Sequence, residues 1–327
     1  MRTHPLLLAL ILAGGVANAA DAPAFAAKRV VILVIDGARW TETFGEPQRQ
    51  YVPVQAKELM PQGVFFSDFA NDGPTYTNAG HSALVTGFHQ EINNSGLELP
   101  ANPTLFQFWL KQSGAPITDA WVVSSKDKLQ ILTDSTAPGW RHQHVCSQDC
   151  GKGGGGVGAG YRDDATTRKR VFEVLREHKP HVLLINLKEP DASGHGKNWE
   201  GYLQGIRDGD AFAGELWTVL RDEAPFAGET ALFITNDHGR HVDGHKDGFV
   251  SHGDDCPGCR RIQLIALGPG FRKGAVVERH GNQTDVAVTA AAILGLTIPD
   301  SQGRVLTELV IEPAAVQKAE PAKDAGK

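Results

Sequence analysis

The sequence lacks several features that define whole classes of protein. Basic residues are outnumbered, with 32 Lys and Arg against 38 Asp and Glu, which gives a net charge of −6. A nucleic-acid binder normally carries a basic stripe, so we expect no nucleic-acid partner. Aromatic residues make up only 7% of the chain, no internal repeat is visible, and the composition is otherwise close to the globular average. Collagen-like, disordered and repeat architectures are therefore excluded.

Long apolar runs are also scarce. The apolar stretch Pro5–Ala13 follows Arg2 and precedes Ala17-Asn18-Ala19. It is well short of the ~20 apolar residues that a membrane span needs. A basic start, a short apolar core and an A-x-A site are typical of a signal peptide. We expect a signal peptide over residues 1–19, a periplasmic or secreted mature protein, and no membrane span after cleavage.

Only four cysteines are present, in two local pairs. They are Cys146, Cys150, Cys256 and Cys259. An even number of cysteines in an oxidising compartment favours two disulfides, and their pairing is left open. The same C-x3-C and C-x2-C spacings would also suit a four-cysteine zinc site, which is the alternative.

Apolar runs bounded by turn residues set the expected fold. The runs without polar alternation, typical of strands buried on both faces, are 30–35, 120–123, 182–187, 231–234 and 262–267. Apolar spacings of three and four predict helices over 166–177 and 202–220, and an Ala-rich helix is expected over 285–296. Strands alternating with helices predict an α/β fold with a doubly wound, mostly parallel sheet flanked by helices. We expect one domain over residues 20–311 and a disordered tail over 312–327.

Polar side chains that suit a metal follow three of these runs. The strands of an α/β sheet bind ligands at their carboxyl ends. The residues placed there are Asp36, Asp191, His195, Asp237, His238 and, shortly afterwards, His252. Carboxylate oxygen together with imidazole nitrogen suits Zn²⁺, Mn²⁺ or Fe rather than Ca²⁺. Taken together, these residues predict a metal site.

A nucleophile is predicted in the segment that follows Asp72. Residues 73–87 have the pattern of a loop that runs into a helix ending at Gly87, with Thr77 placed as its N-cap. There the hydroxyl would face the positive end of the helix dipole, which favours an alkoxide and an incoming anion. Structural capping alone is the simpler interpretation of Thr77, and the nearby metal residues argue for the catalytic one.

These motifs resemble the alkaline phosphatase superfamily, particularly its nucleotide pyrophosphatase/phosphodiesterase-like branch. The matching elements are Val-Ile-Asp36-Gly37, Thr77-x-x-x-His81, Glu-Pro-Asp191-x-x-Gly-His195, Thr-Asn-Asp237-His238-Gly and His252-Gly. The resemblance covers about residues 30–296 and implies an alkaline phosphatase-like domain with two divalent metal ions. Zinc is the expected metal, and manganese or iron are alternatives.

The resemblance also implies which residues bind each metal ion. Asp191, His195 and His252 would bind one ion, with His245 as a competitor of His252. Asp36, Asp237, His238 and the Thr77 oxygen would bind the other, whereas His81 is taken as structural. Candidate partners for the substrate phosphoryl group are Asn78 and Asn94, with Asn93 as a further candidate.

The implied activity is hydrolysis of a small-molecule phosphoric ester through a phospho-threonine intermediate. The stretch Thr77-Asn-Ala-Gly-His81 lacks both the Cys or Ser and the Arg that sulfatases of the superfamily require, which argues against sulfatase chemistry. A phosphodiesterase is favoured slightly over a phosphatase. Hydrolysis of a phosphonate or another phosphorus ester at the same site, and a catalytically silent metal-binding periplasmic protein, are the alternatives.

Overall fold

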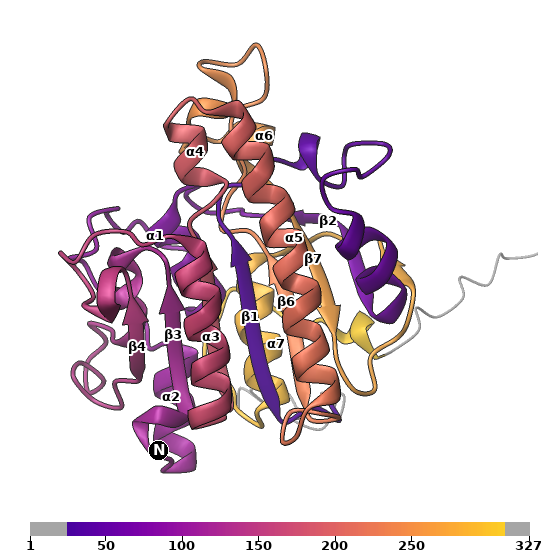
Figure 1. Ribbon diagram of the computed structural model, residues 1–327. Coiled ribbons are helices and arrows are strands. Elements are labelled where there is room, and N and C mark those ends of the chain that lie inside the picture. The colour runs from indigo at the N-terminus through magenta and orange to yellow at the C-terminus, as the bar shows by residue number, and fades with distance from the viewer. Residues whose placement is uncertain (1–24, 311–327) are drawn as a thin grey trace, which may run out of the picture.

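The computed structural model describes residues 25–310, and its centre is one mixed sheet (Figure 1). The strand order is β4-β3-β5-β1-β6-β7-β2-β8, and β9 pairs with β2. All neighbouring strands pair in parallel except that β7 runs antiparallel to both β6 and β2. The expected mostly parallel sheet is confirmed. The expected signal peptide and tail lie outside the described residues.

The sheet is built from strands of two to seven residues. The strands are β1 (Arg29–Ile35), β2 (Val64–Ala70), β3 (Ala120–Ser124), β4 (Ser147–Cys150), β5 (Val182–Leu187), β6 (Thr230–Thr235), β7 (Arg261–Leu267), β8 (Ala275–Val277) and β9 (Gly281–Asn282).

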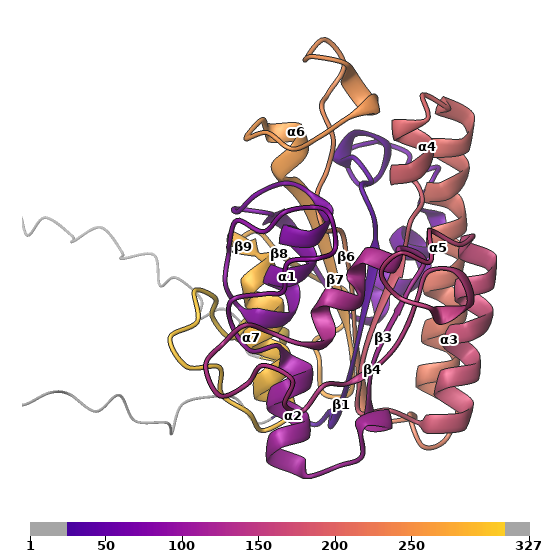
Figure 2. The same ribbon diagram turned by 90° about the vertical axis from the view of Figure 1, so that its left-hand side faces the viewer.

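Helices cover both faces of the sheet, as the view in Figure 2 shows. One face carries α3 (Asp164–His178) and α5 (Trp199–Asp222). The opposite face carries α1 (Thr77–Thr86), α2 (Leu105–Ser113) and α7 (Gln283–Ile293). The short helices α4 (Asp191–His195) and α6 (Pro257–Arg260) lie at the edge toward which the arrow of β1 points (Figure 1). The predicted helical layers are therefore confirmed.

The central strand β1 explains why its sequence is apolar throughout. Its alternate residues Val30, Ile32 and Val34 pack in the core shared with α1, α2 and α7. The intervening Val31 and Leu33 pack in the second core, with side chains of α3 and α5. A strand buried on both faces needs apolar residues at every position, because each face removes its side chains from water. These two cores hold the carboxyl ends of the parallel strands at a common edge.

Two other expectations can be compared with the structure. All four cysteines are free thiols, so the predicted disulfides are wrong. In the first pair, the Sγ of Cys150 lies 3.7 Å from the carbonyl oxygen of Val122. Within residues 25–310, no helix has the length and apolar composition needed to cross a membrane.

Candidate active site

The carboxyl ends of three adjacent strands bring the predicted metal residues together. Asp36 directly follows β1, and Asp237 and His238 follow β6 by two and three residues. Asp191 opens α4 just beyond β5. Since β5, β1 and β6 are neighbours in the sheet, these side chains converge although up to 202 positions separate them. All four are buried.

One cluster contains Asp191, His195 and His252. The Nε2 atoms of His195 and His252 lie 3.1 Å apart. They lie 3.3 and 3.4 Å, respectively, from Oδ1 of Asp191. The arrangement includes His252 rather than its competitor His245, whose Nε2 instead contacts Oδ2 of Asp254 at 2.9 Å. The structure thus brings together the three residues that the resemblance implies around one ion.

A second cluster contains Asp36, Asp237 and His238. The Nε2 atom of His238 lies 3.2 Å from Oδ2 of Asp237 and 3.6 Å from Oδ1 of Asp36. These same three atoms are buried and have no hydrogen-bond partner, although Oδ1 of Asp36 forms an ion pair with Nζ of Lys126 at 2.9 Å. Buried polar atoms without a partner are costly, and bound metal ions are one way to satisfy them.

Hydrogen bonds at the far side of each ring orient the two imidazoles. The Nδ1 atom of His238 lies 2.9 Å from the carbonyl oxygen of Gly239, and Nδ1 of His252 lies 2.8 Å from that of Thr75. A carbonyl accepts only, so each Nδ1 carries the proton and each Nε2 is left with its lone pair. This is the arrangement in which histidine ligates a metal.

Several neighbours fix the carboxylates in place. Asn186, in β5, donates from Nδ2 to Oδ2 of Asp36 at 2.9 Å. The backbone nitrogen of Gly37 donates to Oδ1 of Asp237 at 3.1 Å. Arg240 donates from Nη1 to Oδ1 of Asp191. Each carboxylate is therefore held by at least one hydrogen-bond donor, which limits how it can rotate within the cluster.

Thr77 lies at the start of α1, but not as the predicted N-cap. Tyr76 is the N-cap, without a capping side chain, and Thr77 is the first helical residue. The Thr77 hydroxyl is consequently not used on the helix backbone. It accepts a hydrogen bond from Nζ of Lys126 at 3.2 Å. Thr77 as a whole is only 1% exposed.

Lys126 is a candidate site residue that the sequence analysis missed. Its Nζ lies 2.7 Å from Oδ2 of Asp191 and 2.9 Å from Oδ1 of Asp36, and so connects both clusters to Thr77. The signal was present, because Lys126 comes two residues after β3. The rule applied to the strand ends at Asp36, Asp191 and Asp237 would have found it, had it been applied to β3 as well.

Charge and burial together set the ionisation of the clusters. Burial and the neighbouring Asp237 charge raise the pKa of Asp36 well above its usual range. For Asp191, burial acts in the same direction and is the largest single effect, but Lys126 together with His195, His252 and Arg240 outweighs it and holds the pKa well below the usual range. Burial lowers the pKa of His238 and of His252, which keeps both imidazoles in their neutral, ligating form.

The remaining predicted residues lie around the helix start. His81 contacts the carbonyl oxygen of Thr77 at 2.9 Å through Nδ1 and lies 3.1 Å from Nδ2 of Asn186 through Nε2, so both ring nitrogens are engaged. Asn94 accepts from the backbone nitrogen of Asn78 at 3.1 Å, and Nδ2 of Asn78 donates to the carbonyl oxygen of Asn93. A role of Asn78 or Asn94 in holding substrate stays a prediction.

The donor set fits two divalent ions. The candidate ligand atoms of Asp36, Asp237 and His238 all lie within 4.8 Å of one another, as do those of Asp191, His238 and His252. Buried carboxylate oxygens and neutral imidazole nitrogens, without sulfur, are the ligands that Zn²⁺, Mn²⁺ and Fe accept. His238 belongs to both groups, so the two positions are adjacent.

Comparison with known proteins bears on this arrangement. The family model described as Metalloenzyme superfamily matches residues 158–298, which include the candidate ligands from Asp191 onward. Phosphonate monoester hydrolase from Silicibacter pomeroyi superposes with a TM-score of 0.64 at 13% identity, covering 88% of this chain and 78% of the hydrolase. The resemblance to the alkaline phosphatase superfamily is confirmed. Murine ectonucleotide pyrophosphatase/phosphodiesterase 5, solved with AMP, shares the superfamily fold at a TM-score of 0.59 and 15% identity, over 85% and 97% of the two chains.

A curated relative adds a different activity. GPI ethanolamine phosphate transferase 1 of Neurospora crassa is 26% identical over 318 residues, which cover 84% of this chain and 31% of the transferase. The chain thus spans about a third of the length of the curated relatives it matches. The expectation of a periplasmic or secreted protein is wrong by this comparison, because the relatives are named as GPI ethanolamine phosphate transferases and not as enzymes of those compartments.

Proposed function

We propose that this protein is a two-metal phosphoesterase that cleaves a small phosphodiester through a covalent intermediate on Thr77. The observation that carries the proposal is the position of the Thr77 hydroxyl. It lies at the start of α1 and contacts Lys126, whose ammonium group also touches a carboxylate of each candidate metal cluster. Zinc is the expected metal in both clusters, and manganese or iron are alternatives.

The metal ions would supply Lewis acidity at the phosphoryl oxygens and lower the pKa of the Thr77 hydroxyl. The chain's own residues account for the rest. Thr77 releases its hydroxyl proton to solvent, its oxygen attacks phosphorus, and the bond to the leaving alkoxide breaks. The alkoxide takes up a proton from water and departs as the alcohol. The ammonium of Lys126 offsets negative charge at the attacking oxygen, and the positive end of the α1 dipole is suited to an anionic phosphoryl group.

The second half of the reaction needs an acceptor for the phosphoryl group. Attack by water on phosphorus breaks the bond to Thr77 and makes the enzyme a hydrolase. Attack by an alcohol makes it a transferase, which the names of the curated relatives favour as the second candidate. Hydrolysis of a phosphonate ester would use the same groups, and the structural relative from Silicibacter pomeroyi bears that name.

Replacement of Thr77 tests the proposal directly. Thr77→Ala is expected to remove most turnover of nitrophenyl diesters, because the nucleophile and a candidate metal ligand are lost together. Thr77→Ser keeps the hydroxyl and is expected to retain part of the activity. Thr86→Ala is the matched control, since this buried threonine lies at the other end of the same helix and bonds to the carbonyl oxygen of Ser82.

Acid trapping during turnover, followed by mapping of the phosphopeptide, identifies the attacking residue. The phosphoryl group is expected on Thr77. A phosphoryl group on Thr75 or Ser82, or a fully active Thr77→Ala, would contradict the assignment. Thr75 is already engaged, because its Oγ1 donates to the carbonyl oxygen of Asp254 at 2.8 Å. If no mono- or diester is hydrolysed with metal present, a metal-binding protein without catalytic activity is favoured instead.

The acceptor is identified in the same assay. Adding a small alcohol at rising concentration, and measuring the ratio of the new diester of that alcohol to the phosphomonoester formed by water, separates transfer from hydrolysis. A ratio that stays at the value expected from the molar excess of water supports a hydrolase. A strong preference for the alcohol identifies a transferase.

A further inference from the structure

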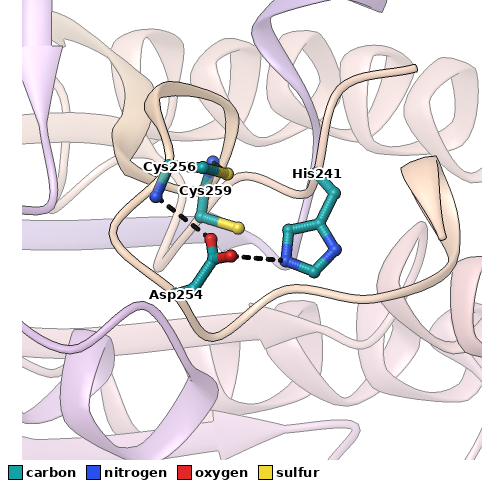
Figure 3. Close-up of side chains that lie close together, drawn as sticks. All are labelled: His241, Asp254, Cys256 and Cys259. Carbon is teal, nitrogen blue, oxygen red and sulfur yellow. Dashed lines mark hydrogen bonds and ion pairs between the residues drawn. The ribbon is translucent and has the colours of Figure 1, made fainter. Parts of the chain in front are cut away.

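A second group of potential metal ligands lies outside the two catalytic clusters. It consists of His241, Asp254, Cys256 and Cys259, whose ligand atoms all lie within 4.8 Å of one another. Figure 3 shows the two thiols, the carboxylate and the imidazole facing a common centre. All four residues belong to the connection between β6 and β7. We propose that they form a separate structural zinc site with two sulfur, one nitrogen and one oxygen ligand.

The cysteine pair has the local geometry of a metal-binding turn. Cys256 is the N-cap of α6, and its Sγ accepts a hydrogen bond from the backbone nitrogen of Cys259 at 3.4 Å. The two cysteines are separated by Pro257 and Gly258, which matches the C-x2-C spacing of structural zinc sites. A sulfur that accepts a backbone N–H is also stabilised as a thiolate, the form that binds metal.

His241 provides an independent indication that the site holds a ligand. Its Nδ1 lies 2.8 Å from Oδ1 of Asp247, so the carboxylate fixes the proton on that nitrogen. Its Nε2 is buried, has no hydrogen-bond partner, and lies 3.3 Å from Oδ2 of Asp254. A histidine held by a carboxylate on one side and presenting a bare nitrogen on the other is the arrangement typical of zinc ligands.

The surrounding charges are those that a zinc site with three anionic ligands would need. Two thiolates and the Asp254 carboxylate would leave one net negative charge on a divalent ion. Lys246 compensates for this, because its Nζ lies 2.7 Å from Oδ2 of Asp254. The metal-free pair of thiols is poorly suited to ionise, since burial and the neighbouring Cys256 raise the pKa of Cys259 to about 12.

The structure also argues against the alternative of one zinc site formed by all four cysteines. Cys150 ends β4, at one edge of the sheet, whereas α6 leads directly into β7. Strands β3, β5, β1 and β6 lie between β4 and β7 in the sheet order. The two cysteine pairs therefore cannot share one ion, and within residues 25–310 it is the second pair that forms a group with a histidine and a carboxylate whose ligand atoms lie within 4.8 Å of one another.

The site would fasten the loop that supplies a catalytic ligand. His241 lies near the start of the connection and Asp254 near its end, and His252 is only two residues before Asp254. The backbone already joins the two sides, because the nitrogen of His241 donates to the carbonyl oxygen of Ser251 at 3.1 Å. A zinc ion bound to both sides would hold His252 at Asp191. This role does not depend on which ester the enzyme cleaves.

Cobalt substitution tests the site with a readout that the catalytic clusters cannot give. Those clusters contain no sulfur, so a thiolate-to-cobalt charge-transfer band reports only on cysteine ligation. The reduced, cobalt-loaded protein is expected to show this band together with the strong visible absorption of tetrahedral cobalt. Cys256→Ser/Cys259→Ser is expected to lose the band and one metal ion per chain by elemental analysis. The matched control, Cys146→Ala/Cys150→Ala, is expected to keep both.

The opposite results overturn the proposal. They are a reduced, cobalt-loaded protein without the band, full metal content in the Cys256→Ser/Cys259→Ser variant, or a Cys256–Cys259 disulfide in the purified protein. The wild-type spectrum alone decides the matter if the double variant fails to fold. Asp254→Asn tests the oxygen ligand, and it is expected to shift the cobalt spectrum while the charge-transfer band persists.

Discussion

Lys126 shows how one side chain can combine structural and chemical roles. It is 1% exposed, and burial by itself disfavours its charged form. The carboxylates of Asp191 and Asp36 outweigh that effect and raise the pKa of Lys126 above its usual range. A permanent positive charge is thereby held against the Thr77 hydroxyl at any physiological pH.

Lys126→Met is expected to lower kcat by about 10²–10³, the range seen when one transition-state donor is removed. The metal-free variant should also lose stability, by about 3–5 kcal/mol, because two buried carboxylates lose their counter-charge. Kinetics with nitrophenyl esters and urea unfolding measure the two effects. Lys57→Met, at an exposed lysine, is the control. Unchanged kcat in Lys126→Met would show that the ammonium is only structural.

His280 predicts a pH dependence of stability. Hydrogen bonding to Asp72 raises its pKa, despite partial burial. A raised folded-state pKa means that the stabilisation is complete below the unfolded pKa of about 6.5 and is lost as pH rises through the folded value. His280→Gln is therefore expected to destabilise the protein at about pH 5 by roughly 0.2–1 kcal/mol, and to have no effect at about pH 9.

Thermal unfolding at the two pH values measures this difference. In the Asp72→Asn background most of the effect of His280→Gln at low pH should disappear, leaving the contribution of Asp68, which lies 3.3 Å from Nδ1 of His280. An equal effect of His280→Gln at both pH values would instead indicate that the residue acts through packing.

At the scale of elements, α1 is positioned by a glycine. A Cβ added at Gly80 would lie 2.3 Å from the backbone oxygen of Asp237, which is too close for any relaxed contact. The helix can therefore approach the loop after β6 only without a side chain at this point. The close approach places the start of α1, with Thr77, beside the candidate ligands Asp237 and His238.

Gly80→Ala is expected to destabilise the protein by about 1–3 kcal/mol through overpacking, despite the higher helix propensity of alanine. It should also lower metal content, because Asp237 must move. Gly214→Ala, inside α5, is the matched control, since the nearest atom there is a methyl group of Val54. Equal stability and metal content in both variants would show that the loop after β6 can move to accept the added methyl group without cost.

The elements differ in how well the sequence predicts them. Strands β1, β5, β6 and β7 were predicted to within a residue or so, because burial on both faces leaves a continuous apolar run. Strand β4, with the sequence Ser-Gln-Asp-Cys, was missed since it pairs only with β3 and carries polar side chains. Strand β2 was missed because Ser67 and Asp68 interrupt its apolar run, where its register with β7 also shifts.

The candidate site shows a similar division. Residues directly after apolar runs, such as Asp36 and Asp237, were predicted, because strand ends meet at one edge of a parallel sheet. The Asn186 contacts were not, since they depend on which face of β5 a single polar residue occupies. The group around His241 was not predicted either, because its ligands come together only through the folding of an irregular loop.

For the whole molecule, the buried carboxylates predict that metal ions contribute to stability. Ligands that bind only the folded state add about 2.7 kcal/mol when present at 100 times their Kd. Removal of metal with a chelator is therefore expected to lower Tm, and zinc should restore it. Repeating the scan with Cys256→Ser/Cys259→Ser separates the loop site from the catalytic clusters. A Tm that is the same with and without chelator would contradict metal binding at both places.

The reversed direction of β7 has a consequence for how such a protein can diverge. Parallel neighbours must be joined by a crossover that returns along a face of the sheet, so changes in those connections disturb a helical layer. The segment between β6 and β7 leaves and re-enters the sheet at the same edge. The connection formed by residues 236–260 can thus change in length or sequence while the strand order and both cores are kept. Reaction chemistry and scaffold can evolve independently at this one junction.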